Sequence, residues 1–260
     1  MSNADLLGKT AIVTGASLGI GRATAIALGR SGANVVVNYH SHSQAAEEVV
    51  QAVRAAGAQA IQVQADVSDQ AAVERLVAAA VAQFGAVDIA ISNAAFSERE
   101  SFHEANMDGF RRTIAVTMWG AYHLLRAATQ QMLRQANGGA IVMVSSPHAY
   151  IPVPKSMAYN MAKAAVDMMA KTAAIEVARA GIRVNVIHPG WIDTPGERKY
   201  ATEESLRSAG DFIPLGRLGT SEEIAEAILV LCDPRHAYMT GTSLLVDGGI
   251  SLPWWSLPLE

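Results

Sequence analysis

The sequence predicts an α/β fold, namely one doubly wound parallel β-sheet of about seven strands with helices on both faces. Short runs rich in β-branched residues alternate with longer alanine-rich amphipathic stretches, an alternation typical of βαβ units. Half of the 260 residues are hydrophobic, which is enough for a sizeable core. The chain shows no linker, low-complexity tract or internal repeat, so we expect residues 1–260 to form a single domain.

The expected strands are short, and most pairs of strands leave room for one helix between them. The strands lie at 10–15, 33–39, 60–67, 87–93, 140–146, 182–190 and 242–249. The expected helices lie at 19–32, 43–57, 69–85, about 106–136 and about 157–180. A helix between two strands returns the chain to the same end of the sheet, so this order favours parallel pairing.

Charge and composition argue against several classes of function. A net charge of −4 and a pI near 6.0 provide no basic surface for nucleic acid or an anionic membrane. No apolar run approaches the length of a membrane span, and the N-terminus lacks the pattern of a secretory signal. Cys232 is the only cysteine, so no intrachain disulfide can form. We therefore expect a soluble cytoplasmic protein that binds neither nucleic acid nor membrane.

The segment TGASLGIG (14–21) lies where the first strand turns into the first helix. Glycines permit a tight turn there and let the backbone approach a pyrophosphate, which rests on the helix N-terminus. The spacing of Gly15, Gly19 and Gly21 differs from the general G-x-G-x-x-G motif, and an ordinary tight turn has a similar composition. Because a doubly wound sheet binds dinucleotides at its first βα turn, we predict a dinucleotide site here.

The residues after the second strand bear on the choice between NAD and NADP. An NAD-selective site carries Asp or Glu there to bind the ribose, whereas this chain has Tyr39, His40, Ser41 and His42. Hydroxyls and imidazoles can donate to a 2′-phosphate, although no Arg is present to bind it in a bidentate manner. We expect NADP to be preferred and NAD to remain possible, with a solvated polar turn as the alternative. No further ligands cluster with the two histidines, so no metal site is predicted.

Tyr159 and Lys163 lie four residues apart in SMAYNMAKAA (156–165), a segment with helical periodicity. Residues four apart share one face of a helix. A nearby cation stabilises a phenolate and lowers its pKa, which makes a tyrosine usable as a general acid or base. The same spacing also occurs by chance on the surfaces of helices, so the pair alone leaves its role open.

Taken together, the motifs resemble those of the short-chain dehydrogenase/reductase family over nearly the whole chain. The matching segments are TGASLGIG (14–21), ADV (65–67), SNAA (92–95), YNMAK (159–163), RVNVIHPGWIDT (183–194) and VDGG (246–249). The resemblance implies a Rossmann-type fold and an NAD(P)-dependent enzyme. Its reaction would transfer a hydride between the nicotinamide and an alcohol or carbonyl substrate.

The resemblance also implies roles for individual residues. Tyr159 would exchange a proton with the substrate oxygen, Ser146 would donate a hydrogen bond to it, and Lys163 would lower the tyrosine pKa and bind the nicotinamide ribose. Ser145 is the structural alternative to Ser146. The residues expected to bind the cofactor are Gly15, Ser17, Leu18, Gly19, Ile20, Gly21, Tyr39, His40, Ser41, Asp66, Val67, Asn93, Ala94, Ala95, Tyr159, Lys163, Pro189, Gly190, Ile192 and Thr194.

Two residues depart from the family pattern. Thr117 stands where the family has the Asn that completes a catalytic tetrad and holds a water through its backbone carbonyl. Thr117 keeps the carbonyl but lacks the carboxamide that helps fix a local helix distortion, so we expect impaired or retuned catalysis. Ala95 replaces a glycine and would narrow access to the nicotinamide.

Within the family, the segments 35–41, 145–154 and 247–256 are similar to those of bacterial glucose 1-dehydrogenases. This resemblance implies a sugar such as D-glucose as the substrate and a homotetramer as the assembly. The residues implied to contact the substrate are Ser146, His148 and Tyr159. His148 is equally well explained as a loop histidine packed near the mouth of the site.

Two further segments have two interpretations each. The stretch 191–213 is expected to form a mobile lid, with a solvated surface helix as the alternative. Trp254 and Trp255 would stack on a sugar or, more in keeping with a C-terminal position, pack against a neighbouring subunit.

Two other functions remain open at this stage. A 3-oxoacyl-[acyl-carrier-protein] reductase shares every family motif, although Leu18 stands where many NADP-dependent reductases have Arg. A non-catalytic NADP(H)-binding sensor would explain Thr117 and Ala95, but it leaves the complete Ser–Tyr–Lys set without a purpose.

Overall fold

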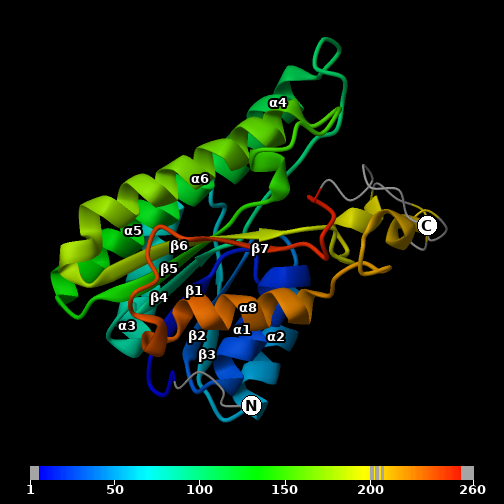
Figure 1. The fold of residues 1–260 in the computed structure, drawn as a ribbon. Coiled ribbons are helices and arrows are strands. Elements are labelled where there is room, and N and C mark those ends of the chain that lie inside the picture. Colours follow the sequence, from blue (N-terminus) through cyan, green and yellow to red (C-terminus); the bar gives the residue numbers. More distant parts are fainter. Residues whose placement is uncertain (1–5, 200–201, 203–204, 206–207, 253–260) are drawn as a thin grey trace.

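A computed structural model describes residues 6–199, 202, 205 and 208–252, and its core is one seven-stranded parallel sheet (Figure 1). The strands are β1 (Thr10–Val13), β2 (Asn34–Tyr39), β3 (Ala60–Gln64), β4 (Ile89–Ser92), β5 (Gly139–Val144), β6 (Ile182–Pro189) and β7 (Ser243–Val246). Their order in the sheet is β3-β2-β1-β4-β5-β6-β7. The chain therefore builds outward from β1 to β3 and then crosses to β4, which confirms the predicted doubly wound topology.

Helices cover both faces of this sheet (Figure 1). One layer contains α1 (Gly19–Arg30), α2 (Ser43–Ala55) and α8 (Ser221–Cys232). The other contains α3 (Gln70–Phe84), α5 (Gly120–Gln135) and α6 (Met157–Val177). Shorter helical segments are α4 (Met107–Thr113), η1 (Ile114–Trp119), η2 (Pro147–Ala149), η3 (Ala178–Ala180), η4 (Glu197–Lys199), η5 (Ala209–Phe212) and η6 (Pro234–His236).

The central strands form a core on each face because successive side chains point to opposite sides. Val13 and Val37 pack with the layer that contains α1, whereas Ile12 and Val36 pack with the layer that contains α3. All four side chains are fully buried. Burial on both faces explains why β1 and β2 read as continuous apolar runs rather than as alternating ones.

Two helical features differ from the sequence prediction. The helix expected at about 106–136 is interrupted by η1, a π-helical segment between α4 and α5. Helix α8 was not predicted, although Thr220 and Glu223 form a reciprocal capping box at its start. Helix α8 packs against α1 and completes the layer on that face of the sheet.

The described part of the chain also bears on two of the expected absences. None of its helices is both long enough and apolar enough to cross a membrane. Within the same residues, no group of three or more His, Cys, Asp or Glu side chains is arranged to hold a metal ion.

Candidate active site

The predicted site residues come from the carboxyl ends of the strands on either side of the crossover between β1 and β4. Gly15 follows β1, Asn93 follows β4, Ser146 follows β5 and Gly190 follows β6. In a parallel sheet these ends lie at one edge, and the crevice at the crossover is where ligands bind. The fold therefore gathers residues that are far apart in the sequence.

The glycine turn after β1 has the form that an anion site needs. Gly15 and Gly19 adopt φ values of +60° and +54°, which favour glycine. Helix α1 begins without a side-chain cap and has no acidic residue in its first turn, so its first N–H groups and its dipole favour a bound anion. A Cβ atom on Gly19 would lie 3.4 Å from the methyl group of Thr194, which places Thr194 beside the turn. Ser17, Leu18 and Ile20 lie within the same turn.

Two asparagine side chains hold this turn in place. The amide group of Asn93 donates to the carbonyls of Thr14 at 2.9 Å and Gly15 at 3.2 Å. The buried Asn38 on β2 accepts from the Gly15 N–H at 3.1 Å and donates to the carbonyl of Ala65 at 3.1 Å. Asn93, which we expected to line the cofactor site, thus fixes the turn. Asn38 was missed, although a polar residue inside the apolar run VVVNY is a signal for a buried hydrogen-bonding role.

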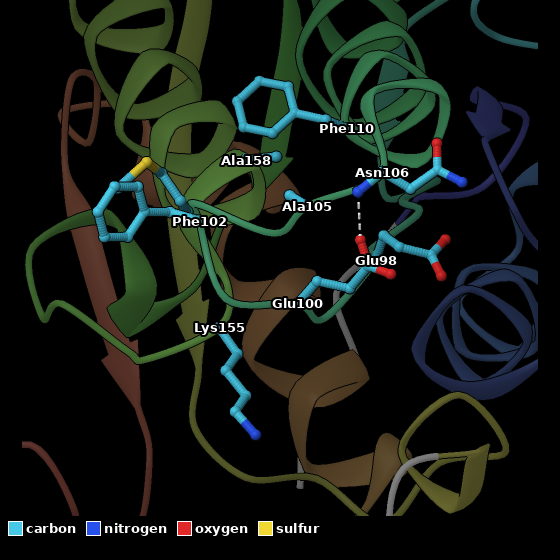
Figure 2. Close-up of a pocket in the computed structure, with 9 residues that line it drawn as sticks. Glu98, Glu100, Phe102, Ala105, Asn106, Phe110, Lys155 and Ala158 are labelled. Carbon is cyan, nitrogen blue, oxygen red and sulfur yellow. Dashed lines mark hydrogen bonds between the residues drawn. The ribbon is translucent and has the colours of Figure 1, made fainter.

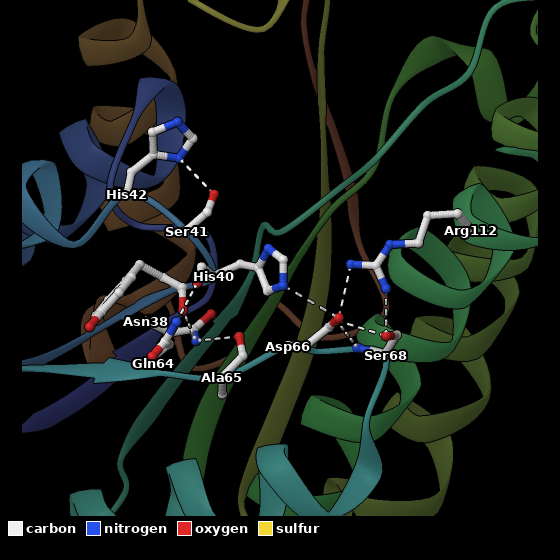
Figure 3. A network of polar contacts seen from close by, with 10 residues as sticks. Asn38, His40, Ser41, His42, Gln64, Ala65, Asp66, Ser68 and Arg112 are labelled. Atoms are coloured by element: carbon white, nitrogen blue, oxygen red, sulfur yellow. Dashed lines mark hydrogen bonds and ion pairs between the residues drawn. The ribbon is translucent and has the colours of Figure 1, made fainter.

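The polar residues after β2 and β3 form a network at the expected ribose end (Figure 3). His40 Nε2 lies 3.6 Å from Asp66 Oδ2, and the guanidinium of Arg112 contacts the same oxygen at 2.9 Å. Burial raises the pKa of Asp66, but hydrogen bonds from Ser68 and Arg112 together hold it below its usual value. Arg112 was missed because it comes from α4. The positive charge of Arg112 offsets the negative charge of Asp66 beside the place expected for the adenosine ribose.

The residues expected to carry the chemistry lie together around the start of α6. The Oγ of Ser146 accepts a hydrogen bond from the His148 N–H at 3.3 Å. The His148 ring meets the Tyr159 ring edge to face at 5.2 Å, and Lys163 Nζ lies 5.3 Å from the centre of the Tyr159 ring. The hydroxyl of Ser145 instead donates to the Lys163 carbonyl, at 3.4 Å. Ser145 is therefore held on the backbone of α6.

Burial is the main cause of the pKa shifts of Tyr159 and Lys163. It raises the pKa of Tyr159 well above its usual value, and the Glu197 charge adds to this shift. It lowers the pKa of Lys163 to about 8, against the opposing charge of Asp167. Lys163 Nζ donates to the Val144 carbonyl at 2.6 Å and lies over the tyrosine ring. The expected lowering of the tyrosine pKa by the lysine is thus absent from this arrangement.

Thr117 lies within the π-helical segment η1 and is buried. Its hydroxyl donates to the Phe96 carbonyl at 2.7 Å and accepts from the Phe96 N–H at 3.0 Å. The distortion of the helix is present without the carboxamide that we considered important for it. Thr117 anchors the loop after β4 to the segment that packs against α6.

The imidazole ring of His148 has a hydrogen-bond partner in Asn160. Its Nδ1 lies 2.7 Å from the carboxamide oxygen of Asn160, whose amide group donates to the Val153 carbonyl at 3.0 Å. Because a carboxamide oxygen only accepts, Nδ1 carries a hydrogen and Nε2 remains an acceptor. Burial lowers the pKa of His148, which keeps the ring neutral. Asn160, the residue after Tyr159, was not predicted to be part of the site.

An ion pair joins the loop after β4 to the stretch after β6. Arg99 Nη2 lies 2.9 Å from Glu197 Oε1, and both side chains are about two-thirds buried. Both charges act on the pKa values of Tyr159 and His148, so the pair stands close to these two side chains. We call this ion pair and its surroundings the mouth of the site.

A pocket lies beside the mouth, between the loop that follows β4 and the start of α6 (Figure 2). Its wall includes Glu98, Phe102 and Lys155, and the Asn106 N–H donates to Glu100 at 2.5 Å there. The pocket therefore flanks the candidate active site.

The remaining predicted residues follow β3, β4 and β6. Val67 and Ile192 are buried, Ala94 donates its N–H to the Thr14 hydroxyl and Ala95 is exposed. A Cβ atom on Gly190, which follows Pro189, would lie 2.5 Å from the Cα of Asp247. Positions 200–201, 203–204 and 206–207 of the expected lid lie outside the described residues, as do Trp254 and Trp255.

Comparison with known proteins yields matches along almost the whole chain. Residues 15–251 match the family model described as enoyl-(acyl carrier protein) reductase. Glucose 1-dehydrogenase 2 of Bacillus subtilis is 38% identical over 249 residues, covering 95% of this chain and 96% of that protein. The 3beta-hydroxysteroid dehydrogenase 1 of Eggerthella lenta is 41% identical over 249 residues, covering 95% of each chain.

An L-rhamnose 1-dehydrogenase (NAD(P)(+)) of a Sphingomonas species is 41% identical over 246 residues, covering 94% of this chain and 97% of that protein. Among solved structures, a short-chain type dehydrogenase/reductase from Mycobacterium marinum superposes with a TM-score of 0.91 at 32% identity. That match covers 96% of this chain and 98% of the other. These relatives share a reaction class but differ in the substrates that their names state.

Proposed function

Because the chain belongs to the short-chain dehydrogenase/reductase family and is an NAD(P)-dependent oxidoreductase acting on a CH–OH group, we propose that it oxidises a sugar such as D-glucose at C1. NADP⁺ is the preferred acceptor in this proposal. Relatives named for a sugar and for a steroid are nearly equally similar to the chain, so overall identity does not discriminate between the substrates. The chemistry of the mouth supports a sugar.

The observation that carries the proposal is the ion pair between Arg99 and Glu197 beside Tyr159. Covering a charged pair with an apolar steroid removes water from both groups without replacing their hydrogen bonds, which is costly. A sugar offers hydroxyls that can accept from the guanidinium and donate to the carboxylate. The neutral His148 adds an acceptor at Nε2 for a further hydroxyl. The mouth therefore favours a small polyhydroxylated substrate.

The glycine turn fits the pyrophosphate of the cofactor, since Gly15 and Gly19 adopt positive φ values and the N-terminus of α1 beside them has no side-chain cap. When bound, the oxidised cofactor would supply the hydride acceptor and a positive charge within the site. In this mechanism Tyr159 takes the hydroxyl proton of the substrate, and Ser146 donates a hydrogen bond to the same oxygen. Lys163 would hold the nicotinamide ribose, and its ammonium group donates to the Val144 carbonyl and lies over the Tyr159 ring.

The test of the proposal is the initial rate of nicotinamide reduction by the purified protein. The panel contains D-glucose, L-rhamnose, a 3β-hydroxysteroid and a 3-hydroxyacyl thioester, each with NADP⁺ and NAD⁺. We expect kcat/KM for an aldose to exceed that for the steroid by about 100-fold or more, since the steroid would leave buried polar groups unpaired. Preference for the thioester would instead favour the 3-oxoacyl-[acyl-carrier-protein] reductase. Tight NADP⁺ binding without any turnover would favour the sensor.

Ser41→Asp should weaken NADP⁺ binding about 10- to 100-fold and leave NAD⁺ binding within about twofold. Ser41 is exposed directly after His40, and the structure has no carboxylate at the end of β2. A new carboxylate there would repel the 2′-phosphate that distinguishes the two cofactors. Fluorescence titration with NADPH and NADH measures both dissociation constants. Ser41→Asn is the matched control, since it changes size without charge, and an equal loss of both cofactors in Ser41→Asp would contradict this assignment.

The same proposal includes a homotetramer. On α6, Met161, Met168 and Ile175 recur at seven-residue spacing and are 52%, 63% and 81% exposed. Trp119 at the end of η1 and Tyr122 in α5 are also exposed large hydrophobic residues. Such apolar surface on two long helices supports association with further copies of the chain. Sedimentation velocity measures the assembly.

A single domain over 1–260 and a cytoplasmic location remain predictions.

A further inference from the structure

Two hydrogen bonds connect the side chain that follows Tyr159 to the imidazole of His148 and to the loop that precedes α6. The carboxamide oxygen of Asn160 lies 2.7 Å from His148 Nδ1, and the amide nitrogen of Asn160 donates to the Val153 carbonyl at 3.0 Å. Asn160 lies in the first turn of α6, whereas His148 belongs to η2. The function proposed above uses His148 but gives Asn160 no part.

The Val153 carbonyl fixes the direction of both hydrogen bonds. A carbonyl oxygen only accepts, so the amide nitrogen of Asn160, rather than its oxygen, must face Val153. The carboxamide oxygen then faces His148, and because this oxygen also only accepts, His148 Nδ1 must carry a hydrogen. In a neutral imidazole the other nitrogen, Nε2, is then a bare acceptor. Burial lowers the pKa of His148, which favours the neutral ring.

Val153 is suited to be the fixed point of this arrangement. It lies between Pro152 and Pro154, and the ring of each proline locks the φ angle of its own residue. A residue that precedes a proline is itself confined to extended backbone. The backbone at Val153 therefore has few alternative conformations, so its carbonyl can hold the orientation of the Asn160 carboxamide.

The atom left for a ligand is His148 Nε2. None of the described residues forms a hydrogen bond with Nε2, and the imidazole is only partly buried. The ring meets the Tyr159 ring edge to face at 5.2 Å, and the backbone N–H of His148 donates to Ser146 Oγ at 3.3 Å. A reacting carbon held by Ser146 and Tyr159 would therefore lie beside the imidazole. The substrate group nearest to Nε2 would then be the one on the neighbouring carbon.

We propose that Asn160 is a positioning residue for substrate selection, which holds the hydrogen of His148 on Nδ1 so that Nε2 accepts from a substrate hydroxyl next to the reacting carbon. The substrate class is accordingly a vicinal diol, such as the C1 and C2 hydroxyls of an aldose. A ketone or ether oxygen on the neighbouring carbon is disfavoured, because two acceptors would face each other. The selection of substrate rests on the function proposed above, whereas the state of the His148 ring does not.

Asn160→Ala should raise the KM of the best aldose in the panel about five- to tenfold, the size of one hydrogen bond, and leave kcat within about threefold. Without its anchor, the imidazole no longer presents Nε2 to the substrate. A hydrogen bond to a hydroxyl that does not react is present in both the ground state and the transition state, so its loss changes KM and not kcat. Initial rates over a range of aldose concentrations measure both constants. An equal fall in kcat with unchanged KM would overturn the proposal.

A 2-deoxy analogue of the same aldose tests which substrate group is selected. The unaltered chain should prefer the aldose about tenfold in kcat/KM, because the analogue leaves Nε2 without a donor. Asn160→Ala should reduce this preference to about twofold, since neither substrate then meets a held imidazole. A preference of equal size in the two proteins would overturn the role of Asn160 in selection.

A double-mutant cycle with His148→Leu tests whether Asn160 acts through His148. If it does, Asn160→Ala causes no further rise in KM once the imidazole is absent. If Asn160 acted only by holding the loop at Val153, the two effects would add, and that result would contradict the proposal. Asn137→Ala is the matched control, because Asn137 is exposed after α5, and it should leave KM and kcat unchanged.

Nuclear magnetic resonance tests the state of the ring without any substrate. In protein labelled with ¹⁵N at histidine, the His148 ring signals are assigned by their loss in His148→Leu. At a pH about two units above the ordinary histidine pKa of about 6.5, we expect a proton on Nδ1 and a bare Nε2 in the unaltered chain. In Asn160→Ala the proton should move to Nε2 in part of the molecules.

Two results of this measurement would overturn the role of Asn160. One is a proton on Nε2 in the unaltered chain, and the other is the same distribution of the proton in Asn160→Ala as in the unaltered chain. If no substrate in the panel is turned over, the proposed function fails, while this measurement still decides whether Asn160 positions His148.

Discussion

Tyr159→Phe should lower kcat about 1,000-fold while leaving the dissociation constant of NADP⁺ within about twofold. The variant removes only the hydroxyl that exchanges a proton with the substrate, and such a group is worth roughly 10²- to 10⁴-fold in rate. The phenyl ring keeps the contacts with His148 and with Lys163, so the local packing is preserved. Initial-rate kinetics at saturating substrate and titration with NADP⁺ measure the two quantities separately.

Tyr150→Phe is the matched control for this prediction. Tyr150 follows η2 near the same catalytic group, and its ring packs against His188, but the mechanism gives its hydroxyl no part. We expect its kcat to change by less than about threefold, as for an ordinary surface substitution. Retention of a tenth or more of the original rate in Tyr159→Phe would show that another group exchanges the proton. A regulatory NADP(H)-binding protein would be indifferent to the change.

Gly21→Ala should abolish measurable NADP⁺ binding and destabilise the chain by about 2 kcal/mol, the cost typical of an overpacked site. A Cβ atom at Gly21 would lie 2.5 Å from the amide nitrogen of Asn93 and closer still to the Gly15 carbonyl oxygen. Neither neighbour can give way, because Asn93 itself holds the turn through hydrogen bonds to Thr14 and Gly15. The glycine turn must therefore move, which displaces the backbone N–H groups that are expected to bind the pyrophosphate.

Chemical denaturation and cofactor titration measure the two effects of Gly21→Ala. Gly196→Ala provides the control, since its Cβ would meet nothing closer than 3.6 Å, which is an ordinary contact. We expect this variant to bind NADP⁺ normally. If Gly21→Ala were destabilised but still bound NADP⁺ with unchanged affinity, the dinucleotide would have to bind away from the turn after β1.

The sheet was predictable because its local and global signals agree. Residues such as Val35, Val36 and Val37 form apolar β-branched runs, and burial on both faces requires such runs. The spacing of Thr220 and Glu223 is the sequence pattern of a capping box, so the start of α8 was also predictable from the sequence. The π-helical segment η1 has no comparable pattern. Its key contact, between Thr117 and the Phe96 backbone, exists only after the loop has folded back.

For the site, helical spacing placed Tyr159 and Lys163 close together but did not fix where the ammonium points. Its bond to the Val144 carbonyl and its burial are tertiary properties, and they govern the pKa values of both groups. Arg112 escaped prediction for the same reason, since it reaches Asp66 from α4, whereas Asn38 had a signal in the apolar run of β2. Local rules thus predicted that Tyr159 and Lys163 lie close together, whereas the electrostatics required the assembled fold.

Helix α6 carries two sets of side chains whose purposes differ. Tyr159 and Lys163 lie on the face that turns toward the sheet, whereas Met168 and Ile175 are exposed on the opposite side. A helix moves as one rigid rod, so a rotation imposed on one face displaces the other. Contacts between subunits on the exposed face of α6 would then help to hold Tyr159 and Lys163 in position. Dilution of the assembled enzyme should therefore reduce its turnover number as well as its molecular mass.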